Sequence, residues 1–436
     1  DRAGLSRAIE AGIKRFAPGV LRTVALYTPA PASDQFGMGP AAGGNYSLLQ
    51  QSLREGFSVR ETDLTSGQVP ADADLLLVVG PEELDDKQQV AIDQFLMQGG
   101  TVILAASRFQ VDLSGGSISA RKANTGLEDW LAHQGLTLEP KLVLDPQNTP
   151  FPIPVQRDLG GFSVQEIQTL DYPYFPDIRG DGLAEDSGIT ASLGQITLNW
   201  SSPIAIDAAQ NAGRQIVKLI QSSPKAWTSD SENMQPDFDQ HGSLGFAHGD
   251  DQGRKVLAVA IEGRFQSPFA GKPSPLLARP TESEADAAET PDSPDDSKDD
   301  PEMPVEKEKA PVISGVVESS PASARLILIG SSSFLTDTAI SLATQATQTR
   351  YLKPVELVQN AVDWSLEDRG LLSLRGRGQF SRLLEPIGQQ GRLFWESLNY
   401  LLALSGLALV YWLYRRARAR RERGYAAILG TGDKTS

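Results

Sequence analysis

The first part of the chain alternates short apolar runs with longer stretches of helical periodicity. The strand-like segments are residues 22–27, 57–64, 74–80 and 101–107. The helix-like segments between them are residues 45–56 and 84–100, and both end in glycine. Strands that alternate with helices predict a parallel sheet covered on both faces. We therefore expect a flavodoxin-like or Rossmann-like layer sandwich up to about Ser107.

The pattern changes after a further helix predicted over residues 124–135. Strand-like pieces separated by Pro, Gly and Asp continue to residue 272, and they fit either a β-rich second region or an elaboration of the first sheet. After an acidic stretch, a buried strand, a helix start and a strong helix over residues 354–368 follow, with Pro354 at its first turn. A last strand is predicted over residues 371–377. We expect this α/β segment to rejoin the first sheet.

A second kind of apolar run lies near the carboxyl end. Residues 397–414 contain no charged side chain, and their helical length of about 27 Å approaches the roughly 30 Å of a bilayer core. Tyr and Trp cluster toward the ends of this run, and a block of arginines begins at Arg415; an arginine at mid-bilayer costs about 2.5–3.5 kcal/mol. We expect one transmembrane helix, with the basic tail cytoplasmic and residues 1–392 outside the inner (cytoplasmic) membrane. The alternative is a buried core helix with a basic end.

These patterns divide the chain into eight segments. They are an N-terminal helix or connector (1–19), the first α/β part (20–135), the β-rich region (136–272), an acidic disordered linker (273–322), the rejoining α/β segment (323–376), a juxtamembrane connector (377–392), the transmembrane helix (393–414) and the basic tail (415–436). The sequence opens on Asp1 rather than Met, with no export signal before the first strand. We expect an upstream signal or membrane segment in the parent protein.

The amino-acid composition excludes several kinds of site and partner. The chain contains no cysteine, which excludes disulfides, thiolate metal sites and a cysteine nucleophile. Its net charge is -15, and the folded part is acidic, whereas nucleic-acid binding needs clustered Lys and Arg. We therefore expect no nucleic-acid partner.

No segment of the chain matches a known catalytic motif. The glycines of "GMGPAAGG" come ten residues after Tyr27 and lack dinucleotide-binding spacing, which favours a flexible loop, although the helix amides after Asn45 could receive an anion. "GSSSF" is not a nucleophile elbow, so its serines are interpreted as helix-capping residues. His241 and His248 lie among aspartates but match no ligand spacing. We expect no metal and no cofactor. The glycosylation sequons at Asn45 and Asn199 are interpreted as chance matches.

Several phrases together resemble a known family. They are "ADADLLLVVGPEEL", "IDQFLMQGG", "SPIAID", "LAVAIEG", "RLILIGSSSFLTD" and "QNAVDWSLED", followed by the apolar run and its arginines. In this order they resemble the auxiliary component of the gliding-motility-type ABC transport system, the GldG-like family. The resemblance covers residues 22–423, with gaps in the middle region and the acidic stretch.

The resemblance implies a non-enzymatic subunit that stands beside an ABC permease, with a separate ATPase. It implies a fold akin to class I glutamine amidotransferases and the intraflagellar-transport ectodomains. The amidotransferase nucleophile is a cysteine, which this chain lacks, so that chemistry does not carry over. An envelope polysaccharide, peptidoglycan or a protein is the expected ligand. A membrane-anchored carbohydrate hydrolase using carboxylates and a scaffold without ligand are the alternatives.

Ligands of α/β folds bind at the carboxyl ends of the sheet strands. The predicted ligand-binding residues at those ends are Gly80, Pro81, Glu82, Ser107, Arg108, Ser331, Ser332, Ser333 and Asp337. Each of them is also an ordinary turn former, so the prediction comes from sheet geometry rather than from a motif.

Overall fold

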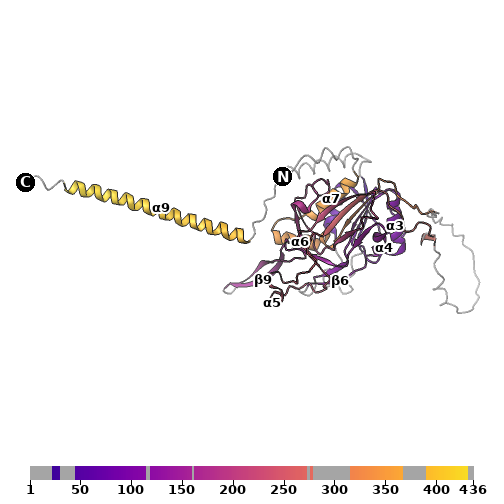
Figure 1. The fold of residues 1–436 in the computed structure, drawn as a ribbon, viewed down its shortest axis with the longest axis horizontal. Coiled ribbons are helices and arrows are strands. Elements are labelled where there is room, and N and C mark those ends of the chain that lie inside the picture. Colours follow the sequence, from indigo (N-terminus) through magenta and orange to yellow (C-terminus); the bar gives the residue numbers. More distant parts are fainter. Residues whose placement is uncertain are drawn as a thin grey trace, which may run out of the picture. The chain divides into compact units, whose positions relative to one another are not determined.

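The structure is a computed structural model that describes residues 22–29, 45–113, 118–159, 162–272, 275–277, 315–366 and 389–430 (Figure 1). It divides into two compact units, residues 1–381 and residues 382–436. Five sequence predictions lie wholly or mostly outside the described residues. They are the N-terminal helix, the flexible loop over 37–44, most of the acidic linker, the strand over 371–377 and the juxtamembrane connector.

A seven-stranded sheet forms the centre of the first unit, in the order β14-β16-β17-β4-β3-β1-β2. Its strands are β1 (Thr23–Tyr27), β2 (Ser58–Glu61), β3 (Leu75–Val79), β4 (Thr101–Ala105), β14 (Gln215–Gln221), β16 (Val256–Glu262) and β17 (Arg325–Ile329). The five strands from β2 to β17 pair in parallel. β16 and β14 add to the β17 side in antiparallel orientation. The expected parallel sheet is therefore present within a mixed sheet.

Helices cover both faces of this sheet (Figure 1). They are α2 (Ser47–Gly56) and α7 (Lys353–Leu366) on one face, α3 (Asp86–Met97) and α4 (Glu128–His133) on the other, and α6 (Asp337–Thr347) near the end of the sheet. Side chains of a strand point alternately to its two faces. Leu26 accordingly packs in the same core cluster as Leu53 of α2, whereas Tyr27 packs in the cluster that contains Ile92 of α3. Apolar residues at every strand position thus produce a sheet buried on both sides.

The chain between α4 and β17 extends the fold beyond the sheet. Besides β14 and β16, this part of the chain forms short two-stranded antiparallel sheets. A further one, β5 with β6, lies just before α4. These pairs are β5 (Phe109–Asp112) with β6 (Ser119–Lys122), β7 (Leu136–Leu138) with β13 (Ile204–Ile206), β8 (Leu142–Leu144) with β15 (Trp227–Ser229), β9 (Phe151–Leu159) with β10 (Phe162–Leu170), and β11 (Asp177–Arg179) with β12 (Gln195–Thr197).

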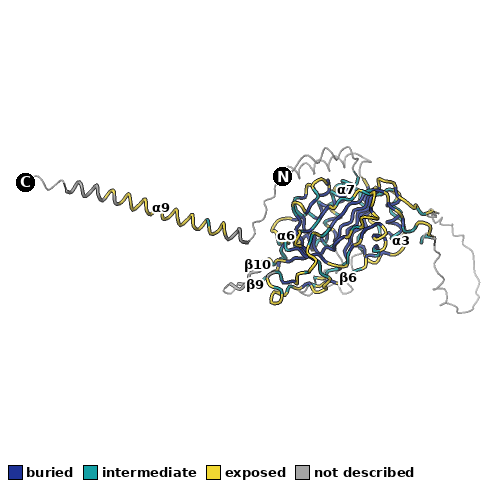
Figure 2. The backbone as a smooth tube through the Cα atoms, in the orientation of Figure 1, coloured by how far each residue is buried: buried dark blue, intermediate teal, exposed yellow. Residues whose placement is uncertain are grey.

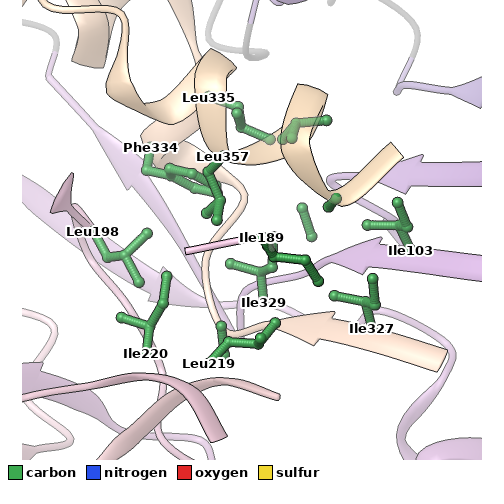
Figure 3. Close-up of a cluster of buried hydrophobic side chains, with 14 of the residues drawn as sticks. Ile103, Ile189, Leu198, Leu219, Ile220, Ile327, Ile329, Phe334, Leu335 and Leu357 are labelled. Atoms are coloured by element: carbon green, nitrogen blue, oxygen red, sulfur yellow. The ribbon is translucent and has the colours of Figure 1, made fainter. Parts of the chain in front are cut away.

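Two core clusters hold this extension to the sheet. Figure 3 shows Ile189 and Leu198 of the extension among Ile220 of β14, Ile329 of β17 and Leu357 of α7. An aromatic cluster lies further out, where the ring centres of Phe175 and Trp200 are 4.9 Å apart, with the rings edge to face. Buried aromatic side chains contribute much of the apolar area in such a core.

Local sequence signals set the helix boundaries. α3 begins with a reciprocal capping box, in which Gln88 N–H donates to Asp85 (2.8 Å) and the Gln88 side chain accepts from Asp85 N–H (3.0 Å). The N-cap of α6 is Thr336, whose hydroxyl accepts from Ala339 N–H (3.2 Å). Pro354 is the second residue of α7, where its missing N–H costs no helical hydrogen bond.

The second unit contains α9 (Gln389–Gly430), which has no break between the apolar run and the arginines. Residues Phe394–Arg418 are long and apolar enough to cross a membrane, and none of this span is buried within the chain. In Figure 2 the residues of α9 that carry a burial colour are almost entirely coloured as exposed. Leu404 and Leu407, for example, are 67% and 68% exposed.

Candidate functional site

The residues predicted to bind a ligand lie at the carboxyl edge of the parallel strands. Gly80–Glu82 follow β3, Ser107 and Arg108 follow β4, and Ser331–Ser333 follow β17. Asp337 is the first residue of α6. Two groups can be distinguished along this edge: residues that bind another part of the chain, and residues around β1 and β3.

The ends of β4 and β17 are occupied by residues 199–203. Ser202 N–H donates to the carbonyl oxygen of Gly330 (2.6 Å), and the Ser331 hydroxyl donates to the carbonyl oxygen of Asn199 (2.7 Å). A Cβ on Gly330 would lie 2.2 Å from the carbonyl oxygen of Ser202, so only glycine allows this approach. The chain itself therefore fills the position that a ligand would take beside Ser331.

Ser107 and Arg108 also bind within the protein. The Ser107 hydroxyl accepts from Phe109 N–H (3.2 Å) and donates to the Phe109 carbonyl oxygen (2.9 Å). Arg108 forms an ion pair with Glu128 at the start of α4, and its side chain is 20% exposed. Its Nε is buried without a hydrogen-bond partner among the described residues. These contacts attach the end of β4 to α4.

Asp337 binds the amino end of α2. Its carboxylate accepts from Ser47 N–H (3.2 Å), Leu48 N–H (3.0 Å) and the Ser47 hydroxyl. Asp337 N–H in turn donates to the carbonyl oxygen of Asn45 (2.8 Å). The N-cap residue of α2, Tyr46, provides no side-chain cap. A carboxylate at this position satisfies the free amides and interacts favourably with the helix dipole. The anion at the amides after Asn45 is thus a residue of the protein.

Ser332 and Ser333 belong to the turn between β17 and α6. The carbonyl oxygen of Ser333 accepts from the Thr336 hydroxyl (2.8 Å) and from Thr336 N–H (3.1 Å). Ser332 precedes the short 3-10 helix Ser333–Leu335, and its side chain lies close enough to the Tyr46 phenol to lower the pKa of that group. Of the three serines, Ser332 is the one that faces the β1 and β3 side.

The second group surrounds the ends of β1 and β3. Gly80 has a φ of +60°, and a Cβ there would lie 2.7 Å from the Tyr46 hydroxyl oxygen. The following residue, Pro81, is buried, whereas Glu82 is exposed. Gln110 Nε2 donates to Glu82 Oε1 (3.3 Å). Glu82 is therefore an exposed acidic group of this half of the edge.

Two tyrosines that the sequence analysis did not single out complete this group. Burial raises the pKa of Tyr46, and the nearby Glu82 carboxylate raises it further. Burial also raises the pKa of Tyr27, as do Glu82 and Asp63, while a hydrogen bond with the Glu82 backbone lowers it. Both phenols therefore stay neutral at physiological pH and act as hydrogen-bonding groups. Their positions, at the end of a strand and at the start of a helix, are the signal that could have identified them.

The segment that contains His241 and His248 forms no comparable site. Among the described residues, no group of three or more His, Cys, Asp and Glu side chains is arranged to hold a metal ion. His248 stacks against Trp227, with ring centres 4.5 Å apart. Asp237 caps the short helix α5 (Phe238–His241) by accepting from Gln240 N–H (2.9 Å). Asn199 of the second sequon is 2% exposed, so it is not accessible to a glycosyl donor.

Comparison with known proteins gives distant matches to individual chains. A protein of Borreliella burgdorferi, described as uncharacterized, is 22% identical over 222 residues, which are 49% of this chain and 41% of that protein. The match thus spans less than half of the relative's own length.

Two solved structures are similar to this chain at low TM-scores. The mmIFT52 N-terminal domain has a TM-score of 0.38 and 10% identity, covering 79% of this chain and 98% of that one. A putative ThuA-like protein from Bacteroides uniformis has a TM-score of 0.35 and 9% identity, covering 80% and 93%.

A family model also matches most of the chain. It covers residues 23–361, from the first residue of β1 into α7, and so includes the whole sheet and the edge described above. The matched family is an auxiliary component of an ABC-type transport system. The chain therefore belongs to the auxiliary family described as an ABC-type uncharacterized transport system.

Proposed function

We propose that this chain is a membrane-anchored, extracytoplasmic subunit of an ABC transporter that lacks ATPase activity and works with a permease and a separate ATPase. The observation that carries the proposal is the family match over residues 23–361, followed in the same chain by an exposed apolar helix. A 25-residue helical span whose side chains are not buried in the protein needs an apolar environment. The arginines from Arg415 onward favour a cytoplasmic carboxyl end.

The proposed ligand or partner site is the end of the sheet at β1 and β3. The five parallel strands follow the order β2-β1-β3-β4-β17, which is the flavodoxin-like order. In that order the chain leaves β1 and β3 in opposite directions, and the crevice between their ends is the usual ligand position. Tyr27, Tyr46, Glu82 and Ser332 supply hydrogen-bonding groups there. An envelope polysaccharide, peptidoglycan or a protein of the complex has the hydroxyl, amide or cationic groups to match them.

The same geometry supports a binding rather than a catalytic role. The neutral phenols provide hydrogen bonds, and the exposed Glu82 provides hydrogen bonds and negative charge. A hydrolase could use Ser331 and Asp337 as reactive groups. Here the Ser331 hydroxyl is hydrogen-bonded to Asn199, and the Asp337 carboxylate is hydrogen-bonded to the amides of α2. We therefore favour recognition over hydrolysis at this edge.

Co-purification from native membranes tests the proposal. The full chain should recover a permease and an ATPase when it is solubilised in mild detergent and captured through an affinity tag. Glu82→Gln should reduce recovery of whatever binds the β1 and β3 edge, whereas Glu83→Gln, also exposed, should not. Recovery of neither transporter subunit with the intact chain would count against the proposed function.

A further inference from the structure

The hairpin of β9 and β10 is a two-stranded sheet of its own. Its strands pair antiparallel over nine residues each, from Phe151 opposite Leu170 to Leu159 opposite Phe162. At about 3.4 Å per residue, each strand is roughly 30 Å long. β10 pairs with no strand other than β9 in the described part of the chain. An isolated two-stranded ribbon is only marginally stable in water, so further pairing at a free edge would stabilise it.

Prolines close the outer edge of β9. In an antiparallel pair, residues alternate between positions whose N–H points to the partner strand and positions whose N–H points away. Proline has no N–H and fits only at the outward positions. Pro152 and Pro154 therefore occupy two of the four outward positions of β9, and these two positions have no donor. Pro152 is also buried, and β9 contacts α6.

The outer edge of β10 has the opposite character. The register places Thr169 opposite Pro152 and Ile167 opposite Pro154, so these two residues also point their backbone groups outward. By the same alternation, Gln165 and Ser163 do so as well. None of the four is a proline. Residues 166–169 are all exposed, and Ile167 is 43% exposed. The hairpin thus has one closed edge and one open edge.

We propose that the open edge of β10 pairs with β10 of a second copy of this chain, forming a four-stranded antiparallel sheet in the order β9-β10-β10-β9. One open edge per chain makes a closed two-fold pair rather than a filament, because both outer edges of the new sheet are the proline-bearing edges of β9. This inference adds to the proposed function and does not rest on it.

Charge selects the register of the pair. Glu166 is the one charged residue of β10. A two-fold axis at Glu166 would place two carboxylates directly opposite each other, which destabilises an antiparallel pair. An axis at Ile167 instead places Glu166 opposite Gln168 of the second copy and the two Ile167 residues opposite each other. This register pairs residues 164–170 of both copies.

Site-specific disulfide formation tests the pairing in native membranes that contain the full chain. The sequence has no cysteine, so Ile167→Cys introduces its single thiol. Directly opposite residues at such a position have Cα atoms about 5.5 Å apart, which suits a disulfide. Mild oxidation should convert most of the 46.9 kDa chain into a species of twice that mass. Ile153→Cys, on β9 and 38% exposed, is the matched control and should remain monomeric.

A second pair of variants tests the backbone contribution. Ile167→Pro removes an outward N–H and leaves the hydrogen bonds to β9 intact, so it should weaken self-association at least about tenfold, measured by light scattering in detergent. Ile167→Thr retains the N–H and should still associate. Equal cross-linking at positions 167 and 153 would overturn the proposal. So would an Ile167→Pro chain that associates like the wild type, or an Ile167→Cys chain that cross-links to another protein and not to its own copy.

Discussion

The carboxylate of Asp337 accepts a hydrogen bond from the backbone N–H of Leu48 at 3.0 Å, across 289 residues of sequence. This contact joins β17 and α6, the last βα unit of the sheet, to α2, the first helix in the described part of the chain. It also neutralises the helix amides that would otherwise be available to an anion at the edge of the sheet. This side chain is thus one of the links between the first and last parts of the matched family region.

Removing that carboxylate should destabilise the first unit. Asp337→Ala leaves the α2 amides uncapped and should lower the free energy of unfolding by about 1–2 kcal/mol, measured by urea denaturation of the purified chain. Thr338→Ala, at the exposed neighbouring position, should change stability by less than about 0.5 kcal/mol. Equal stability of Asp337→Ala and the wild type would show that the contact contributes nothing to folding.

Gly80 should tolerate a side chain less well than Gly180. Both have positive φ, +60° and +50°, so alanine costs about 1–2 kcal/mol of backbone strain at either position. Only at Gly80 would the new methyl group also meet the Tyr46 hydroxyl, whereas Gly180 has nothing within 4 Å. Gly80→Ala should therefore lose about 1–3 kcal/mol more than Gly180→Ala, as measured by thermal unfolding. Similar losses for both variants would contradict the close approach of Tyr46.

Asp93 should make stability depend on pH. Its side chain is fully buried and accepts from Trp130 Nε1 (3.0 Å), the Ser267 hydroxyl (2.6 Å) and Gln94 Nε2 (2.9 Å). Burial raises the pKa of Asp93 above its ordinary 3.8, and the hydrogen bonds partly offset this. Because the folded pKa is the higher one, the stability contributed by this group is full below pH 3.8 and is lost as the pH rises through the folded pKa.

Asp93→Asn has no proton to lose, so its free energy of unfolding should decline less than that of the wild type as the pH rises above 3.8. Urea denaturation of both proteins between about pH 4 and pH 8 measures the difference. Parallel pH profiles would mean that Asp93 does not change its protonation state in this range.

The apolar span of α9 should be sensitive to charge at its centre. Leu404→Arg places an arginine near mid-bilayer, at a cost of about 2.5–3.5 kcal/mol, and should increase the fraction of chain extracted by alkaline carbonate. Leu413→Arg lies two residues before the arginine block and should remain in the membrane fraction. Unchanged extraction for both variants would argue against a bilayer-spanning segment.

Much of the sheet could be predicted because its strands are continuous apolar runs. The runs over 74–80 and 101–107 became β3 and β4, and the expected return of the chain to the sheet after the acidic stretch corresponds to β17, which pairs with β4. Strands that are buried on both faces have apolar residues at every position, so the apolar run itself identifies the strand.

The β9 and β10 hairpin was not predicted. Pro152 and Pro154 interrupt the apolar pattern of β9, and proline within a run usually demotes a strand. The signal that marks the hairpin is the pair Gly160 and Gly161 between two segments rich in apolar residues.

The candidate site could be placed on the sheet edge from sequence, but its contacts could not. The Ser331 hydroxyl donates to the carbonyl oxygen of Asn199, and the Asp337 carboxylate accepts from the amides of α2. In both contacts the partner lies more than 100 positions away in the sequence. No local pattern encodes such partners. Tyr27 and Tyr46 were missed because each resembles an ordinary core aromatic until β1 and β3 are seen side by side.

Thiol labelling on intact and permeabilised cells tests the membrane-anchored account most directly. Two single-cysteine variants suffice, Ser283→Cys in the acidic stretch and Ser436→Cys at the carboxyl end, because the sequence has no other cysteine. A membrane-impermeant maleimide should reach the thiol of the Ser283→Cys variant once the outer envelope is opened. It should reach the thiol of the Ser436→Cys variant only after the inner membrane is permeabilised. Labelling of both positions from the same side of that membrane would contradict the account.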